Sequence, residues 1–174
     1  MKITILFFII GFTYCQLISQ IEMLLLGKSS RQNIDDRHHD VKQVVEENGF
    51  PFEEHQVLTE DGYILTLHRI PGEKGAPAVL LQHGNEMCSI SWVINSPDLA
   101  PAFILARAGF DVWMGNNRGT YYSEKHIKYD KTQKEFWDFD FEEMGLYDQP
   151  AQIDYILAAT GLPKISAYVG HSEG

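Results

Sequence analysis

The sequence ISAYVGHSEG, at residues 165–174, decides the fold class of this chain. Its first half, residues 165–169, is a mostly apolar run with the length of a buried strand. Its second half follows Gly-x-Ser-x-Gly, the pattern of a sharp turn from strand to helix that holds a serine hydroxyl exposed at its tip. The segment therefore predicts an α/β protein with Ser172 as nucleophile, flanked by Gly170 and Gly174, where side chains would collide with neighbouring elements.

The segments before this turn predict the sheet that carries it. A hairpin comes first, because two strand-like runs flank the turn signal at residues 60–62. Strand and helix patterns then alternate, which favours an open α/β sheet whose later strands are parallel. The unbroken apolar run at 78–81 is typical of a strand buried on both faces. The expected elements are strands at 54–59, 63–70, 78–81, 110–114 and 165–169, a helix at 99–108, and a helix N-capped by Asp148 and ended by Gly161.

Three predicted strands end in glycine-bearing turns, and these glycines are Gly84, Gly115 and Gly170. Ligands of open α/β sheets bind at the carboxyl ends of the strands, so we expect the chemistry there. A turn such as the one at His83 can point its next backbone N–H at a developing oxyanion. We therefore expect acyl transfer by Ser172, with the backbone N–H groups of Asn85 and Glu173 as the oxyanion hole.

Separate blocks along the chain resemble one known family. They are NGFP at 48–51, EDGYIL at 60–65, LQHG at 81–84, AFILA at 102–106, DVWMGN at 111–116, EFW at 135–137, FEEM at 141–144, YD at 147–148, PA at 150–151, ID at 153–154 and the serine turn. In this order they are similar to the acid lipases of gastric and lysosomal type within the α/β-hydrolase fold. The resemblance implies a secreted or lysosomal hydrolase of neutral lipid esters, of triacylglycerol or sterol ester type, that works at a lipid–water interface without cofactor or metal.

Two residues at the expected site depart from that family. The family usually has leucine after His-Gly, where this chain has Asn85, and glutamine after the serine, where this chain has Glu173. Because the oxyanion hole uses backbone N–H groups, neither change removes a donor. An ionised Glu173 would nevertheless oppose a developing oxyanion.

Other candidate residues receive structural interpretations. We expect His171 to be a packing residue, because neighbours on such a turn point apart, and His83 to stabilise its turn through hydrogen bonds. The stretch at 135–143 interleaves aromatic and acidic residues and is interpreted as half-buried with a solvated acidic face. Cys88 has no nearby basic partner and is given no catalytic role. The pair at 38–39 is interpreted as solvated surface rather than metal ligands.

Length and charge exclude several classes of protein. The 174 residues suffice for one domain, and the mix of 44% hydrophobic and 22% charged residues is that of an ordinary globular protein. The net charge is −10, and no cluster of lysine and arginine is present to neutralise phosphates, so nucleic acid is excluded as a partner.

The N-terminus has the pattern of a targeting segment. Residues 1–15 combine a positive start, an apolar run and a cleavage site before Gln16, which predicts a secretory signal peptide. A signal anchor is the less favoured alternative, because polar residues interrupt the apolar run at 17–26. Residues 16–47 are expected to form a polar leader or linker, and 48–174 the N-terminal portion of the lipase domain, with no integral membrane span after signal removal.

Serine hydrolases of this fold place their catalytic groups in the chain order Ser, then Asp or Glu, then His. The chain ends at Gly174, directly after the serine turn. The expectation is therefore an incomplete α/β-hydrolase fold, present as an N-terminal fragment that is inactive alone. The alternative is a non-catalytic, lipase-like product that binds lipid or another protein.

Overall fold

The computed structural model describes residues 40–174. The predicted signal peptide, the rival signal anchor, the His38-His39 pair and most of the leader lie outside the described residues. Between 40 and 174, no helix is both long enough and apolar enough to cross a membrane.

Six strands form one mixed sheet in the order β1-β2-β4-β3-β6, with β5 paired to β2 outside this path. The hairpin of β1 and β2 is antiparallel, as is the pairing of β2 with β4. Strand β3 is parallel to both β4 and β6, so the expected hairpin and the expected parallel later strands are confirmed. The strands are β1 (Glu53–Leu58), β2 (Tyr63–Ile70), β3 (Ala78–Gln82), β4 (Asp111–Met114), β5 (Lys125–His126) and β6 (Ala167–Gly170).

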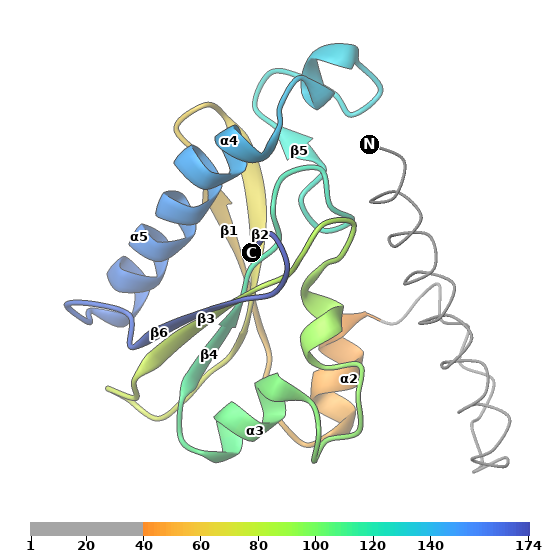
Figure 1. The fold of residues 1–174 in the computed structure, drawn as a ribbon. Helices are drawn as coiled ribbons and strands as arrows, with labels where there is room; N and C mark the ends of the chain where they lie inside the picture. Colours follow the sequence, from red (N-terminus) through yellow and green to blue (C-terminus); the bar gives the residue numbers. More distant parts are fainter. Residues whose placement is uncertain (1–39) are drawn as a thin grey trace, which may run out of the picture. The chain divides into compact units, whose positions relative to one another are not determined.

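Helices cover both faces of the sheet. Figure 1 shows α2 and α3 on one side and α5 on the other, and two separate apolar clusters fill the two interfaces. The α-helices are α2 (Val41–Glu47), α3 (Pro101–Arg107), α4 (Phe141–Glu143) and α5 (Gln149–Thr160). Two short 3₁₀ turns, Ser89–Trp92 and Lys134–Trp137, and a π-helical turn, Met144–Asp148, complete the list.

Strand β3 lies between β4 and β6, and all five of its residues are buried. Val79 and Leu81 belong to the cluster that contains Phe103 of α3, whereas Leu80 belongs to the cluster that contains Ile156 of α5. Full burial of a side chain of this size contributes about 1.5–3 kcal/mol. Both faces of β3 therefore hold the layers together, as its unbroken apolar sequence predicts.

The predicted N-cap at Asp148 is wrong. Its side chain caps no backbone N–H of α5, and its carboxylate instead receives hydrogen bonds from Arg118. The helical segment begins earlier, where Asp140 and Glu143 form a capping box, and it reaches α5 through α4 and the π-helical turn. A buried guanidinium needs an anion beside it, so the carboxylate of Asp148 pairs with Arg118. Because the π-helical turn leads directly into α5, that helix needs no side-chain cap at Asp148.

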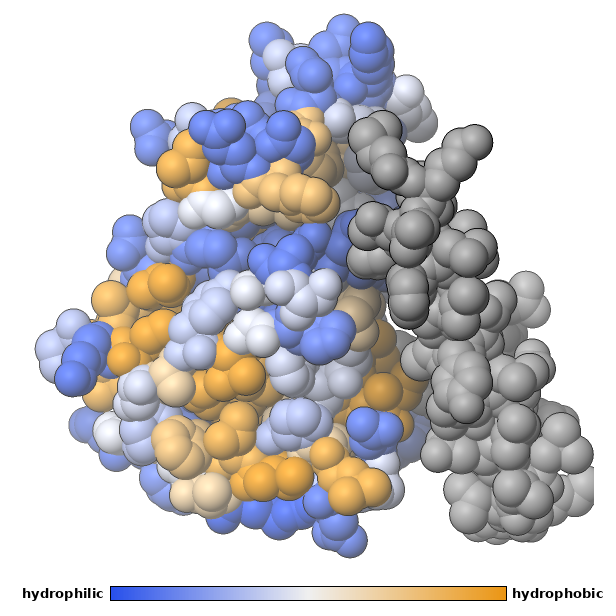
Figure 2. Space-filling model, viewed as in Figure 1, coloured by the Kyte–Doolittle hydropathy of each residue, from blue (hydrophilic) through white to orange (hydrophobic). Residues whose placement is uncertain are grey.

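The expectation that the strand before the serine is buried is also wrong. All four residues of β6 are exposed, because β3 is its sheet neighbour among the described residues and lies on one side of it. Figure 2, in the same view as Figure 1, shows apolar patches between hydrophilic ones on the face where β6 lies. Within β6, the side chains of Tyr168 and Val169 are exposed.

Candidate active site

Three strand ends meet where the chemistry is expected. The N–H of Gly115, after β4, donates to the Leu81 carbonyl of β3 (3.0 Å), and the N–H of His171, after β6, donates to the Gln82 carbonyl (3.0 Å). A side chain on Gly84 would touch both Ser172 and His171. The glycine turns at 84, 115 and 170 are therefore neighbours, as the parallel sheet predicts.

Ser172 lies exposed at the tip of the turn after β6, with a φ of 60°. Few residues other than glycine adopt this left-handed conformation, and its cost is of order 1–3 kcal/mol when the surroundings impose it. A hydrogen bond from the N–H of Gly174 to the carbonyl of His171 (3.0 Å) closes the turn. The geometry is that of the sharp turn that the Gly-x-Ser-x-Gly pattern predicts.

The flanking glycines are required by close backbone approach. A β-carbon on Gly170 would overlap the carbonyl of Gly174, and one on Gly174 would lie 2.5 Å from the carbonyl oxygen of Gln82. On Gly84, a β-carbon would lie 2.7 Å from Cβ of Ser172. No side chain fits at these three positions without moving backbone, so the serine turn and the turn after β3 are packed directly on each other.

The two backbone donors expected for an oxyanion hole flank this contact. Within residues 40–174, neither the N–H of Asn85 nor that of Glu173 donates to a protein acceptor. Asn85 follows Gly84, which touches Ser172, and Glu173 follows Ser172 itself. Both N–H groups are thus available to an oxygen that approaches Ser172.

The side chain of Glu173 introduces an acid next to Ser172. Partial burial raises the pKa of this carboxyl above its usual value, which favours the neutral form. The opposition that an ionised Glu173 would offer to an oxyanion is correspondingly smaller in acid.

The histidines have other partners. Among residues 40–174, no histidine nitrogen is hydrogen-bonded to the Ser172 hydroxyl. His83 is buried and bonded to two turns, so the expected stabilising role is confirmed. His171 is exposed, so its expected role as a packing residue is wrong: the strand that carries it has no covering layer in the described chain.

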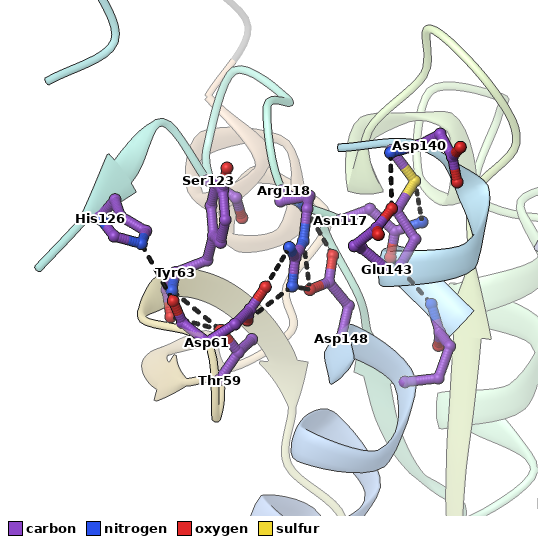
Figure 3. Close-up of polar contacts among 12 residues, drawn as sticks. Thr59, Asp61, Tyr63, Asn117, Arg118, Ser123, His126, Asp140, Glu143 and Asp148 are labelled. Atoms are coloured by element: carbon purple, nitrogen blue, oxygen red, sulfur yellow. Dashed lines mark hydrogen bonds and ion pairs between the residues drawn. The ribbon is translucent and has the colours of Figure 1, made fainter. Parts of the chain in front are cut away.

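An ion cluster that the sequence did not reveal is centred on Arg118 (Figure 3). The fully buried guanidinium of Arg118 binds Asp148 (2.8 Å) and Asp61 (2.5 Å), and it lies 4.0 Å from the ring centre of Tyr63. It joins the turn after β4 to the hairpin turn and to the start of α5. A signal was present, since Asp61 and Asp148 fall within the family blocks and Arg118 lies in the turn four residues after the buried strand β4.

The two carboxylates of this cluster respond differently to Arg118. Burial raises the pKa of Asp148, which is fully enclosed and shares its cation with a second acid. At Asp61, burial acts in the same direction, but hydrogen bonds from Arg118 and Thr59 outweigh it and lower the pKa. The more exposed acid is therefore the better stabilised anion.

The described residues also include the acidic aromatic stretch and Cys88. In the acidic aromatic stretch, Phe136 is buried while Trp137 and Phe141 are exposed, which confirms a half-buried segment. Cys88 forms no disulfide within residues 40–174, and burial raises the pKa of its thiol, which disfavours the reactive thiolate. No group of three or more metal-binding side chains gathers within the part of the chain that the structure describes.

Comparison with known proteins supplies a family for this geometry. Residues 77–174 match the family described as alpha/beta hydrolase fold, and residues 41–96 match the partial alpha/beta-hydrolase lipase region. The chain is 46% identical to mouse gastric triacylglycerol lipase over 157 residues, which cover 86% of this chain and 39% of that protein. It is 50% identical to human lysosomal acid lipase/cholesteryl ester hydrolase over 141 residues, covering 77% of this chain and 35% of the relative.

Solved structures agree on the fold. An esterase of Pyrococcus furiosus superposes with a TM-score of 0.52 at 16% sequence identity, over 79% of this chain and 47% of the esterase. This likeness concerns the fold alone. The chain spans well under half the length of the curated relatives described above.

Proposed function

This chain belongs to the α/β-hydrolase fold family, in its acid lipase branch, and from that premise we propose that it carries the nucleophile and the oxyanion hole of a serine hydrolase acting on neutral lipid esters. The observation that carries the proposal is the geometry of Ser172. Its left-handed turn packs on Gly84, between the unpartnered N–H groups of Asn85 and Glu173.

The proposed reaction uses these groups in sequence. The Ser172 hydroxyl oxygen attacks the ester carbonyl carbon while a histidine base takes its proton, and the N–H groups of Asn85 and Glu173 stabilise the negative oxygen that forms. The ester C–O bond then breaks, and the alcohol leaves with that proton. Water releases the fatty acid from Ser172 by the same steps.

The proposed substrate class and the proposed location of the protein are based on the names of its relatives. Two relatives are named a triacylglycerol lipase and a cholesteryl ester hydrolase. We propose the same class of substrate for this chain, the ester of a neutral lipid presented at a lipid–water interface. Their names are also gastric and lysosomal, which supports secretion or lysosomal delivery.

A non-catalytic binding product is the second candidate. Two observations favour it: within residues 40–174 no histidine nitrogen is hydrogen-bonded to the Ser172 hydroxyl, and β6 presents an exposed face with β3 as its sheet neighbour. Unpaired strand edges and exposed apolar surface recruit other chains or lipid.

A fluorophosphonate probe separates the two candidates. The longest natural product of the gene is treated with the probe, and the modified residue is identified by mass spectrometry. Modification at Ser172, lost in Ser172→Ala and kept in the exposed control Ser166→Ala, supports the hydrolase. An unmodified Ser172 in a folded, soluble product would favour the binding protein.

A further inference from the structure

The imidazole of His83 is held between backbone groups of two different turns. Its Nε2 lies 3.2 Å from the backbone nitrogen of Asn117, which donates to it, and its Nδ1 lies 2.8 Å from the carbonyl oxygen of Gly84. The side chain is almost fully buried. Each ring nitrogen thus has one fixed backbone partner.

These partners define the protonation state of the ring. A backbone N–H can only donate, so Nε2 must carry a free electron pair, and a carbonyl oxygen can only accept, so Nδ1 must carry the proton. The neutral Nδ1–H tautomer alone satisfies both bonds. Burial also lowers the pKa of His83, which is consistent with a neutral ring.

The Gly84 carbonyl that His83 holds belongs to the peptide unit that supplies the Asn85 N–H. The same oxygen also accepts the N–H of Met87 (3.2 Å), so two donors fix its direction. A trans peptide unit is planar, and its C=O and N–H point to opposite sides. Fixing the carbonyl of Gly84 therefore fixes the direction of the Asn85 N–H, beside the contact between Gly84 and Ser172.

The other partner of His83 is itself firmly anchored. The Asn117 side-chain oxygen accepts hydrogen bonds from Gln82 (3.0 Å) and Gln149 (2.8 Å). The next backbone N–H along the chain, that of Arg118, donates to the buried Asp148 (2.9 Å). The turn after β4, which contains Asn117 and Arg118, therefore orients the His83 ring and also carries the cation of the ion cluster.

From this arrangement we infer that His83 is a positioning residue: its neutral imidazole sets the orientation of the Gly84–Asn85 peptide and so aims the Asn85 N–H at the oxyanion. The inference rests on the proposed function of Ser172 and Asn85 and adds a residue that contacts neither substrate nor serine hydroxyl. It acts through the peptide plane, and rate enhancement depends on such donors being oriented in advance.

Two matched substitutions separate the two bonds of the ring. In His83→Asn, the amide nitrogen can occupy the place of Nδ1, which keeps the donor to Gly84 and loses the acceptor for Asn117. In His83→Gln, the longer amide can place its oxygen near Nε2, which keeps the acceptor for Asn117 and loses the donor to Gly84. Both variants are compared with the wild type in the full-length protein, by kcat and KM for a soluble p-nitrophenyl ester and by melting temperature.

The expected result is that His83→Gln lowers kcat by about 10- to 100-fold with KM unchanged, since losing one oxyanion donor outright costs about 10²–10³. His83→Asn retains kcat within about fivefold. Both variants lose one buried hydrogen bond, so their melting temperatures should fall by about the same amount. Equal kcat losses that follow melting temperature would overturn the positioning role and leave a structural one.

Two further measurements keep this result apart from the proposed function. The ¹⁵N spectrum of the wild-type protein at pH 7 should show His83 as the Nδ1–H tautomer, and an Nε2–H tautomer or an imidazolium would refute the inference without any variant. Ser172→Ala should abolish turnover. Full turnover in that variant would instead show that Ser172 is not the nucleophile, and the inference about His83 would lose its premise.

Discussion

Gly84 and Ser172 lie so close together that a β-carbon on Gly84 would lie 2.7 Å from Cβ of the serine. The same β-carbon would lie 2.9 Å from the carbonyl oxygen of His171. The contact joins the peptide of the proposed oxyanion donor, Asn85, to the turn of the proposed nucleophile, Ser172. The spacing of nucleophile and donor is therefore set by the absence of a side chain at one position.

Replacing Gly84 by alanine should separate these two turns. We expect Gly84→Ala to slow fluorophosphonate modification of Ser172 at least about tenfold, with a loss of about 1–3 kcal/mol in stability from overpacking. The matched control is Gly145→Ala, because a β-carbon there has open space around it. Equal modification rates in the two variants would show that the Gly84 contact has no role in the reactivity of Ser172.

The acid beside the nucleophile should shape the pH profile. Glu173 has a raised pKa, so its carboxyl is neutral in acid and becomes an anion next to the oxyanion site as the pH rises. We expect Glu173→Gln to raise kcat at pH 7 by about three- to tenfold, a modest factor because solvent screens a mostly exposed charge. At a pH well below the pKa of Glu173, the two proteins should have the same kcat, because both residues are then neutral.

The measurement is kcat for a soluble ester as a function of pH in the full-length protein. Glu135→Gln, an exposed acid outside the serine turn, serves as the control and should leave the profile unchanged. A difference between Glu173→Gln and wild type that is independent of pH would argue against charge as the cause.

The buried ion cluster should dominate local stability. Arg118→Met leaves Asp148 enclosed without a cation, which costs about 3–5 kcal/mol when one partner of a buried pair is removed. Arg107→Met, which breaks the exposed pair with Asp98, should cost about 0–1 kcal/mol. Urea unfolding followed by circular dichroism gives both values.

If Arg118→Met does not fold, Asp148→Asn tests the same pair. It keeps the shape of the side chain and removes one of the two anions bound by Arg118. A loss as small as that of Arg107→Met would mean that the cluster contributes no net stability.

The described chain should also be a weak hydrolase by itself. Ser172 has no histidine partner within residues 40–174, and the loss of the histidine of a serine triad typically costs on the order of 10⁴–10⁶ in turnover. A polypeptide of residues 1–174 should therefore react with a fluorophosphonate at least about 10⁴-fold more slowly than full-length protein. Comparable rates would require another group in this chain to activate the serine.

Sequence reasoning succeeded where local pattern and tertiary structure agree. The apolar run at 78–81 predicts a strand with two buried faces, and Gly-x-Ser-x-Gly predicts the sharp turn with an exposed serine, because both follow from short-range geometry. Asp148 shows why other features were missed. Its place before a helix suggests a cap, but its role is decided by Arg118, thirty positions away in sequence.

Exposure was likewise beyond the reach of local pattern. The residues of β6 have the composition of an interior strand, yet their burial depends on what lies against the far side of the sheet. The orientation of His83 belongs to the same class, because it depends on a backbone N–H from the next strand end.

The parallel pairing of β6 with β3 also bears on the order of folding. Val79 of β3 pairs with Ala167 of β6, 88 positions later, so the loop closed by this pairing contains β4, α3 and α5. Contacts between residues so far apart in sequence form slowly, because closing the loop costs chain entropy before the strand pairing can compensate for it. The left-handed turn at Ser172 comes directly after the strand in this pairing, so we expect the turn to form at a late stage of folding, after the loop has closed.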